Sequence, residues 1–217
     1  MVHRREINGE PIVFGNQGDL YQNAMTWFDH DTGSVWSQPL GEAILGPLKG
    51  ETLELLPSTL STWEDWKRQF PDTLALDTRT VDGGFSLDQL VVVGSVNGDS
   101  AAIAFRQLSD VGALSTEIGG EPVLFVADPE IARWAVFSRL VDGEELNLEL
   151  RDGEVFDPES GHRWDPGLGA PRSGQGTVLD RVPAFSSFGS DYRVFFPDGE
   201  LIDLDGEAPL QADRLWN

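Results

Sequence analysis

The sequence has no cysteine, only two lysines and only three histidines among its 217 residues. The absence of cysteine excludes disulfides, zinc–thiolate centres and thiol nucleophiles. No apolar run approaches the roughly 20 residues of a membrane-spanning helix, so we expect no membrane insertion. The amino-terminal stretch MVHRREINGE has no apolar segment of the kind that a secretory signal carries, which favours a cytoplasmic location.

Basic residues are scarce, and acidic residues are abundant. Asp and Glu total 37 against 15 Lys and Arg, which gives a net charge of −22 at pH 7. Such a surface repels itself at low ionic strength, and salt screens the repulsion to a Debye length of roughly 3 Å at 1 M. We therefore expect a halophilic, archaeal protein, with an ordinary acidic protein of a moderate organism as the alternative. The charge also argues against nucleic acid as a partner, because such binding needs a basic patch.

Turn signals predict a series of short antiparallel hairpins. Asn-Gly and Asp-Gly pairs tolerate the positive φ of tight hairpin turns. They occur at Asn8-Gly9, Asp82-Gly83, Asn97-Gly98, Asp142-Gly143, Asp152-Gly153, Asp198-Gly199 and Asp205-Gly206. Three pairs lie between strand-like runs, at 91–96 with 101–105, at 134–141 with 144–150, and at 194–196 with 201–202.

Two further patterns refine this picture. Leu146, Leu148 and Leu150 alternate with polar residues, which predicts one buried and one wet face. The uninterrupted apolar run from 123 to 127 predicts a buried strand.

Helix is expected in one or two short places. The first covers 62–70, where Ser61 and Glu64 have the spacing of a capping box and Pro71 would stop the helix. A second helical turn is expected at Asp128-Pro129, with Asp as the N-cap and Pro at the first helical position. These patterns together predict a mostly β, α+β protein.

The phrase FDHDTGSVW at 28–36 returns, 128 positions later, as FDPESGHRW at 156–164. The match extends to both sides, and the paired residues include Arg5 and Arg139, Asp29 and Asp157, Trp36 and Trp164, Gly41 and Gly169, Pro57 and Pro183, Asp65 and Asp191, and Phe70 and Phe196. This pattern indicates an internal duplication of one β-rich module.

We predict a first copy at 1–80 and a second copy at 81–217, packed as one compact unit. A segment at roughly 91–138 precedes the aligned part of the second copy and has no counterpart in the first. Because a partial module would leave sheet edges unpaired, we expect strands of the second copy, or another chain, to complete the first.

Four phrases between 28 and 72 have a recognisable spacing. They are D-x-x-T-G-S-x-W-S-Q from Asp29, G-x-A-I-x-G-P-x-x-G from Gly41, L-x-x-L-P from Leu53 and W-x-x-W from Trp63. With these phrases the stretch resembles an uncharacterised prokaryotic family called domain of unknown function 3179. The segments 93–126 and 183–198 are similar to the family's other parts, so the resemblance covers most of the chain.

The resemblance carries over no activity, because none is established for the family. It implies that export is the alternative to a cytoplasmic location, since family members are often exported. The family has a Tyr-Cys-Pro-Leu-Cys-like segment where this chain reads VADPE at 126–130. Any thiol-dependent role in the family therefore cannot apply here.

Alternating carboxylates suggest a cation site. Asp29 with Asp31, and Asp157 with Glu159, each precede a glycine, and Ca²⁺ or Mg²⁺ would accept such oxygen ligands. Neither stretch has a twelve-residue loop with a closing Glu. We expect turns with a capping Asp and a glycine at positive φ, with the metal site as the alternative. No other cofactor is evident.

The candidate ligand-binding residues are Trp36, Ser37 and Gln38. Ser and Gln side chains could orient a polar ligand beside the indole face. The alternative is that Trp36 and Trp164 are matched core anchors and that Ser37 and Gln38 bond the backbone. The second copy reads Asp165-Pro166 at this place, so such a site would belong to the first copy.

We predict a non-catalytic binding or structural module with a small-molecule or protein partner, as a monomer or a homodimer. No catalytic residue can be chosen, because triads and carboxylate pairs assemble in space. One alternative is an enzyme, a hydrolase or a divalent-metal-dependent one, that uses the region from Asp29 to Gln38. Another is a shortened family member that acts as the partner subunit of a longer protein.

Overall fold

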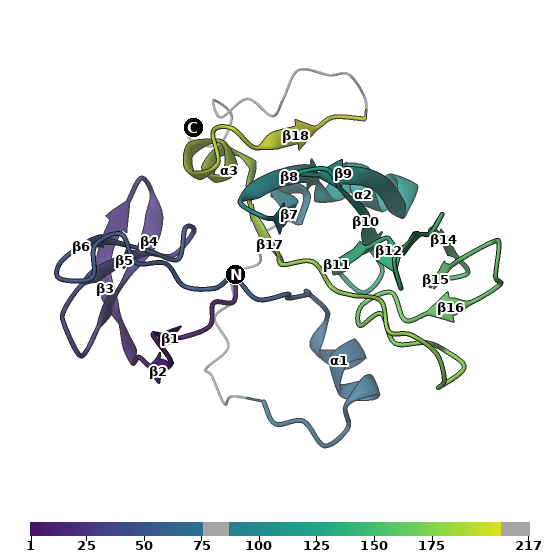
Figure 1. Cartoon of the computed structure of the whole chain (residues 1–217), viewed down its shortest axis with the longest axis horizontal. Helices are drawn as coiled ribbons and strands as arrows, with labels where there is room; N and C mark the ends of the chain where they lie inside the picture. The colour runs from purple at the N-terminus through teal and green to yellow at the C-terminus, as the bar shows by residue number, and fades with distance from the viewer. Residues whose placement is uncertain (76–86, 205–217) are drawn as a thin grey trace.

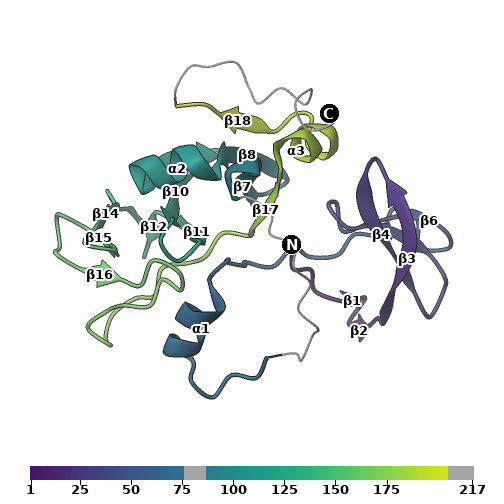
Figure 2. The same ribbon diagram turned by 180° about the vertical axis from the view of Figure 1, so that it is seen from behind.

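The computed structural model describes residues 1–75 and 87–204. Within these residues the fold is mostly β, with antiparallel sheets and short α-helices, as the sequence predicts. Figures 1 and 2 show the strands of the first copy, in purple, at one side of a larger body formed by the later strands, whereas the blue helix Trp63–Gln69 lies apart from them, below that body. No helix in the described part of the chain is long and apolar enough to cross a bilayer.

The first copy is built on a four-stranded antiparallel sheet in the order β3-β4-β5-β6. Its elements are β1 (Glu6–Ile7), β2 (Glu10–Pro11), β3 (Phe14–Tyr21), β4 (Ala24–Asp29), β5 (Val35–Ser37), β6 (Glu42–Leu45) and α1 (Trp63–Gln69). Trp27 on β4 pairs with Trp36 on β5. Trp36, Ala43 and Leu53 form the small buried core of this copy.

The second copy contains the remaining elements. They are η1 (Leu87–Gln89), β7 (Leu90–Val96), β8 (Asp99–Ala104), α2 (Phe105–Val111), β9 (Ala113–Ile118), β10 (Glu121–Asp128), β11 (Arg133–Ser138), β12 (Leu140–Val141), β13 (Glu144–Glu145), β14 (Glu149–Arg151), β15 (Glu154–Phe156), β16 (Arg163–Trp164), β17 (Ala184–Phe188), α3 (Gly189–Phe195) and β18 (Glu200–Ile202).

The sheets of the second copy pack in layers. The sheet β17-β7-β8-β18 and the sheet β11-β10-β9 enclose the largest core, which includes Val92, Ile103 and Phe125. Helix α3 covers the other face of the first of these sheets through Tyr192. The small sheet β14-β15-β16 packs on the other face of β10 and β11, with Trp164 in that core.

Equivalent hydrogen bonds recur in the two copies. Arg5 Nη1 donates to the carbonyl of Ile12 at 3.1 Å, and Arg139 Nη1 donates to the carbonyl of Leu146 at 3.2 Å. Helices α1 and α3 lie at matched positions of the repeat and have the same length. The predicted duplication of a β-rich module is confirmed.

The segment 58–62 of the first copy runs along β11 of the second. Leu60 forms a β-bridge with Trp134, and the Thr62 N–H donates to the carbonyl of Ile131 at 3.0 Å. A strand of the second copy therefore pairs with the first copy inside one chain. The predicted boundary at residues 80 and 81 lies outside the described residues, so it stays a prediction.

Most of the predicted tight turns are confirmed. Both residues have positive φ at Asn8-Gly9, Asn97-Gly98, Asp142-Gly143 and Asp152-Gly153. The predicted hairpin around Asp198-Gly199 is wrong, because the chain before it is helix α3 and β18 runs parallel to β8. The pairs Asp82-Gly83 and Asp205-Gly206 lie outside the described residues.

The other predicted strands are confirmed in part. The β7–β8 hairpin and the buried strand β10 lie where the sequence predicts them. The hairpin after β11 is broken into the short strands β12, β13 and β14. Leu148 is buried and Leu146 and Leu150 pack against the same core, as their alternation predicts.

The predicted helix at 62–70 is confirmed as α1, but its N-cap differs. Thr62 rather than Ser61 caps it, since Thr62 Oγ1 accepts the N–H of Asp65 at 3.2 Å. The predicted helical turn at Asp128-Pro129 is wrong. This stretch joins β10 to β11, and Asp128 Oδ1 caps the turn by accepting the N–H of Glu130 at 3.0 Å.

Candidate functional site

Asp29, at the end of β4, is buried and its carboxylate caps the turn to β5. The N–H groups of Thr32 at 2.6 Å and Ser34 at 3.1 Å, and the indole Nε1–H of Trp36 at 3.0 Å, donate to it. Burial alone would raise the pKa of Asp29, but these hydrogen bonds, led by that of Trp36, lower it below 3.8. Gly33 completes the turn at a φ of 71°.

Asp157 repeats this turn at the end of β15. Its carboxylate accepts the N–H groups of Glu159 and Ser160, both at 3.1 Å, and the hydroxyl of Ser160. Burial opposes ionisation, but these hydrogen bonds and the nearby His162 lower the pKa of Asp157. The geometry thus supports the turn interpretation at both aspartates.

The four carboxylates expected as cation ligands differ in exposure. Asp29 and Asp157 are buried, whereas Asp31 and Glu159 are exposed. In the described ranges no group of three or more His, Asp or Glu is arranged to hold a metal ion. The Ca²⁺ or Mg²⁺ site therefore stays a prediction to be tested in solution.

The residues Trp36, Ser37 and Gln38 do not share one open site. Trp36 is fully buried, with its ring centroid 5.5 Å from that of Phe14. Ser37 is also buried, and its hydroxyl has no hydrogen-bond partner within the described residues. Gln38 is partly exposed and lines a cleft between the two copies. This environment supports the core-anchor interpretation of Trp36.

The second copy has a cavity of about 620 Å³ beside Trp164, the counterpart of Trp36. It lies between the β12–β13 hairpin, the turn after β15 and the loop at 171–177. Its walls combine apolar and uncharged polar side chains (Val141, Leu146, Trp164, Pro171, Ser160, Ser173, Gln175 and Thr177) with ionisable ones (Asp142, Glu144, Asp157, His162, Arg163 and Arg172). A concave space of this size and lining is typical of a small-molecule site.

In the first copy, Leu48 packs against the small core that contains the matching tryptophan. The Leu48 N–H donates to Ser34 Oγ at 3.0 Å, and its side chain packs on the core around Trp36. Ser34 corresponds to His162, which lines the cavity of the second copy. The loop there is two residues shorter than in the first copy and supplies no counterpart of Leu48. The two copies therefore differ where the cavity lies.

Three charged groups around the cavity, Arg163, Arg172 and Asp157, are engaged within the fold, and Asp142 and Glu144 also line it. Arg163 contacts Glu154 at 3.1 Å. Arg172 contacts Glu154 at 2.9 Å and Asp165 at 3.3 Å. The carboxylate of Asp157 is occupied by the turn, as described above. A charged ligand would have to compete with these internal partners.

Asp157, Ser160 and His162 lie close together, but they are not arranged as a nucleophile and its base. The Ser160 hydroxyl donates to Asp157 and accepts the backbone N–H of His162 at 3.3 Å. A catalytic serine needs its base within hydrogen-bond reach. In the described part of the chain no hydrogen bond joins the His162 ring to Ser160, so the contacts are those of a turn.

No motif in the sequence marks the cavity, although Asp157 and Trp164 of its lining belong to the repeated phrase. The signal lies in the difference between the copies, because His162 replaces Ser34 and the following loop is shorter by two residues. The duplication is recognised from residues that are the same in both copies, whereas the cavity depends on residues and a loop length that differ between them.

The fold and these sites define an internally duplicated, mostly β protein with a ligand-sized cavity in one of its copies. The model of the family described as "Protein of unknown function (DUF3179)" matches residues 1–83 and, separately, residues 77–199. The chain belongs to this family, and the two matches agree with the duplication. No curated protein and no solved structure was found to match the chain.

Proposed function

We propose that this protein is a non-catalytic, salt-adapted binding module that holds a small uncharged ligand in the cavity of the second copy. The observation that carries the proposal is the open space beside Trp164, where in the first copy Leu48 packs on the core that contains Trp36. In the first copy this place is filled by a side chain, whereas in the second copy it is open to a ligand.

The pairing of the charged groups supports an uncharged ligand. Arg163 and Arg172 already hold carboxylates, and separating such pairs would cost part of the binding energy. Most of the remaining polar groups in the lining are hydroxyl, amide and backbone groups, with the carboxylates of Asp142 and Glu144 and the ring of His162 beside them. This combination suits a neutral molecule with both polar and apolar faces.

The turn geometry favours binding over catalysis. The hydroxyl of Ser160 and the carboxylate of Asp157 are engaged with each other rather than directed at a shared reacting position. The composition supports the salt-adapted part of the proposal, since a net charge of −22 needs screening for the compact state. The same charge disfavours nucleic acid as a ligand.

The test is a fluorine-detected NMR screen of uncharged fragments in concentrated KCl, followed by amide chemical-shift mapping. We expect fragments that shift the amides of residues 141–146 and 171–177. Hits that map elsewhere, or a response to charged fragments alone, would contradict the proposal.

A further inference from the structure

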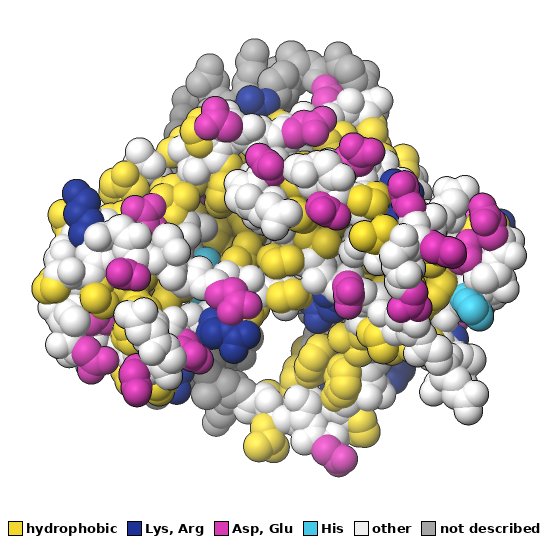
Figure 3. All heavy atoms as spheres, in the orientation of Figure 1, with side chains coloured by type: hydrophobic (Ala, Val, Ile, Leu, Met, Phe, Trp, Pro, Cys, Tyr) yellow, Lys and Arg dark blue, Asp and Glu magenta, His cyan; other side chains and the backbone are white. Residues whose placement is uncertain are grey.

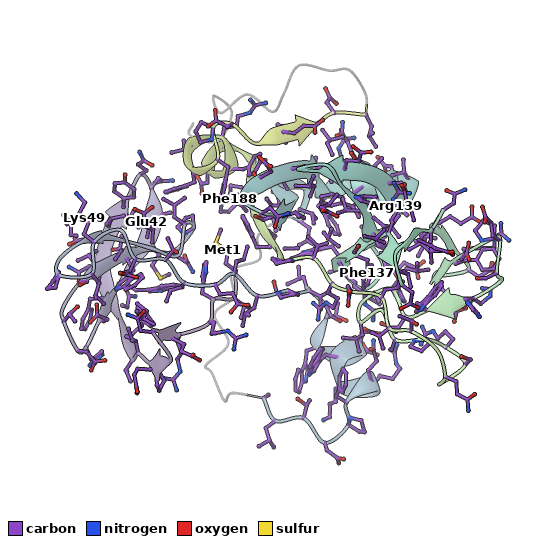
Figure 4. All side chains as sticks on the ribbon, viewed as in Figure 1. Met1, Glu42, Lys49, Phe137, Arg139 and Phe188 are labelled. Atoms are coloured by element: carbon purple, nitrogen blue, oxygen red, sulfur yellow. The ribbon has the colours of Figure 1, made fainter. Side chains whose placement is uncertain are left out.

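A second cleft, of about 470 Å³, lies between the two copies. The first copy lines it with Asn23, Ala24, Met25, Gln38 and Pro39, and the second with Leu90, Ser186, Ser187, Phe188 and Asp191. Met1 borders it as well, and Figure 4 shows Met1 and Phe188 between the first copy and helix α3. Hydrophobic side chains gather in the hollow between the first copy and the central strands in Figure 3.

Asp191 is the charged side chain in this lining, and no ion pair joins it to another described group, although the α-amino group of Met1 borders the same cleft. Its carboxylate receives one long hydrogen bond, at 3.4 Å from Ser190 Oγ, and no ion pair within the described residues. Burial raises the pKa of Asp191 above 3.8. An unpaired, half-buried carboxylate is costly unless something neutralises it.

Asp65, the counterpart of Asp191 in the first copy, has polar partners that Asp191 lacks among the described residues. Asp65 lies at the same position of α1 and forms a buried ion pair with Arg133 of β11. It also accepts hydrogen bonds from Gln69 at 2.8 Å and Ser61 at 3.1 Å, and Arg68 lies 3.4 Å away.

The second copy keeps the counterpart of Ser61, which is Ser187, but replaces two other partners. Arg68 and Gln69 correspond to Val194 and Phe195, and neither of these side chains can donate a hydrogen bond. The repeat thus keeps the carboxylate and a nearby serine but lacks the arginine and glutamine partners at the position that faces the cleft.

The rest of the cleft is suited to an apolar body. Met25 and Phe188 stand at its rim with 42% and 39% of their surfaces exposed. Gln38 adds an amide that can donate or accept a hydrogen bond. The strongly negative chain also raises the local concentration of cations.

We propose that the cleft between the copies binds a ligand that carries a protonated amino or guanidinium group on an apolar body, with the Asp191 carboxylate as its counter-ion. This site is separate from the cavity beside Trp164, so the two proposals can fail independently.

The experiment is an NMR titration of the full chain with benzylamine as the probe and benzyl alcohol as its neutral match. We expect benzylamine to shift the amides of Gln38 and of residues 186–191, and benzyl alcohol to bind much more weakly. Asp191→Asn should weaken benzylamine binding by about tenfold or more, which is the loss expected for a charge-assisted hydrogen bond. Asp110→Asn, which neutralises an exposed carboxylate outside the cleft, should leave binding unchanged.

Met25→Trp provides a second test from the other copy. The larger side chain should block the cleft and abolish binding without touching the carboxylate. Equal binding by wild type and Asp191→Asn, equal binding of the amine and the alcohol, unchanged binding by Met25→Trp, or no shift at these amides would each overturn the proposal. A urea unfolding curve of each variant verifies that it is folded.

Discussion

At the scale of single residues, Asp65 and Asp191 occupy the same position of the repeat but have different surroundings. Asp65 has a buried arginine and a lowered pKa, because the hydrogen bonds and charge of Arg133 outweigh the effect of burial, which would raise it. Asp191 has no such partner, and burial raises its pKa. The sequence matches the two aspartates, but it cannot predict this difference, because Arg133 comes from a distant strand.

Replacing Asp65 by Asn should destabilise the protein by about 3 kcal/mol, because the substitution leaves the charge of Arg133 buried and unpaired. Urea unfolding at constant KCl measures the change. Glu64→Gln is the matched control, since Glu64 is exposed on the same helical turn and should change stability by less than about 0.5 kcal/mol. Similar effects of the two substitutions would contradict the assigned role of the pair.

Replacing Trp36 by Phe should cost about 2 kcal/mol or more, because Asp29 loses a donor and a fully buried side chain is shortened. Trp164→Phe should cost less, since its indole donates to the carbonyl of Thr177 beside an open cavity. Urea unfolding of both variants gives the comparison. A larger loss for Trp164→Phe would contradict the view that the first copy is the filled one.

At the scale of elements, local signals predict most of the tight turns and helix α1, but they miss the equally short helices α2 and α3. The Asn-Gly and Asp-Gly pairs work where two strands flank them, because the turn alone dictates the backbone there. Helix α2 has seven residues, too few for a clear period, and Gly112 at its C-cap is its clearest mark. The repeat predicts helix α3, because Asp191 and Phe196 match Asp65 in α1 and Phe70 at its C-cap. The pair Asp198-Gly199 instead suggested a hairpin at this place.

Three buried aspartates, two that cap turns and one that pairs with Arg133, make the stability depend on pH in acid. Asp29, Asp65 and Asp157 have lowered pKa values, so the unfolded chain binds more protons than the folded chain just below 3.8. The free energy of unfolding should therefore fall as the pH drops from that value through the folded pKa values, by about 1 kcal/mol for each cap lost. Urea titrations over this pH range, in concentrated KCl that screens the surface charge, measure the slope.

The corresponding control is Asp29→Asn, which should show a shallower loss of stability in acid than the wild type. A stability that is flat or that rises over the same range would mean that relief of surface repulsion outweighs the caps, and the capping account would be wrong.

At the scale of the whole molecule, composition and repeats predict the fold class, whereas the positions of the cavity and the cleft depend on tertiary contacts. The sequence predicts the mostly β fold, the duplication and the family resemblance, because these depend on patterns spread over many residues. It cannot predict the cavity beside Trp164, which depends on how the loop at 171–177 crosses the tryptophan. It also cannot predict the cleft, which needs both copies in place.

The net charge of −22 predicts a melting temperature that rises with KCl, because salt screens the repulsion of the folded state. Adding EDTA at constant KCl should leave it unchanged, since the carboxylates of Asp29 and Asp157 already have donors from the fold. A fall with EDTA that Ca²⁺ or Mg²⁺ reverses would instead support the cation site, because a ligand of the native state stabilises it.

The central claim is that the second copy, and not the first, is open to a ligand, and paired substitutions test it most directly. Thr177→Trp fills the cavity at an exposed lining residue, and Glu51→Trp places the same side chain at the matched, exposed position of the first copy. The measurement is the dissociation constant of the best uncharged fragment for wild type and both variants, by NMR in concentrated KCl. The account predicts that binding is lost in Thr177→Trp and kept in Glu51→Trp. Binding that survives Thr177→Trp, or that is lost only in Glu51→Trp, would contradict it.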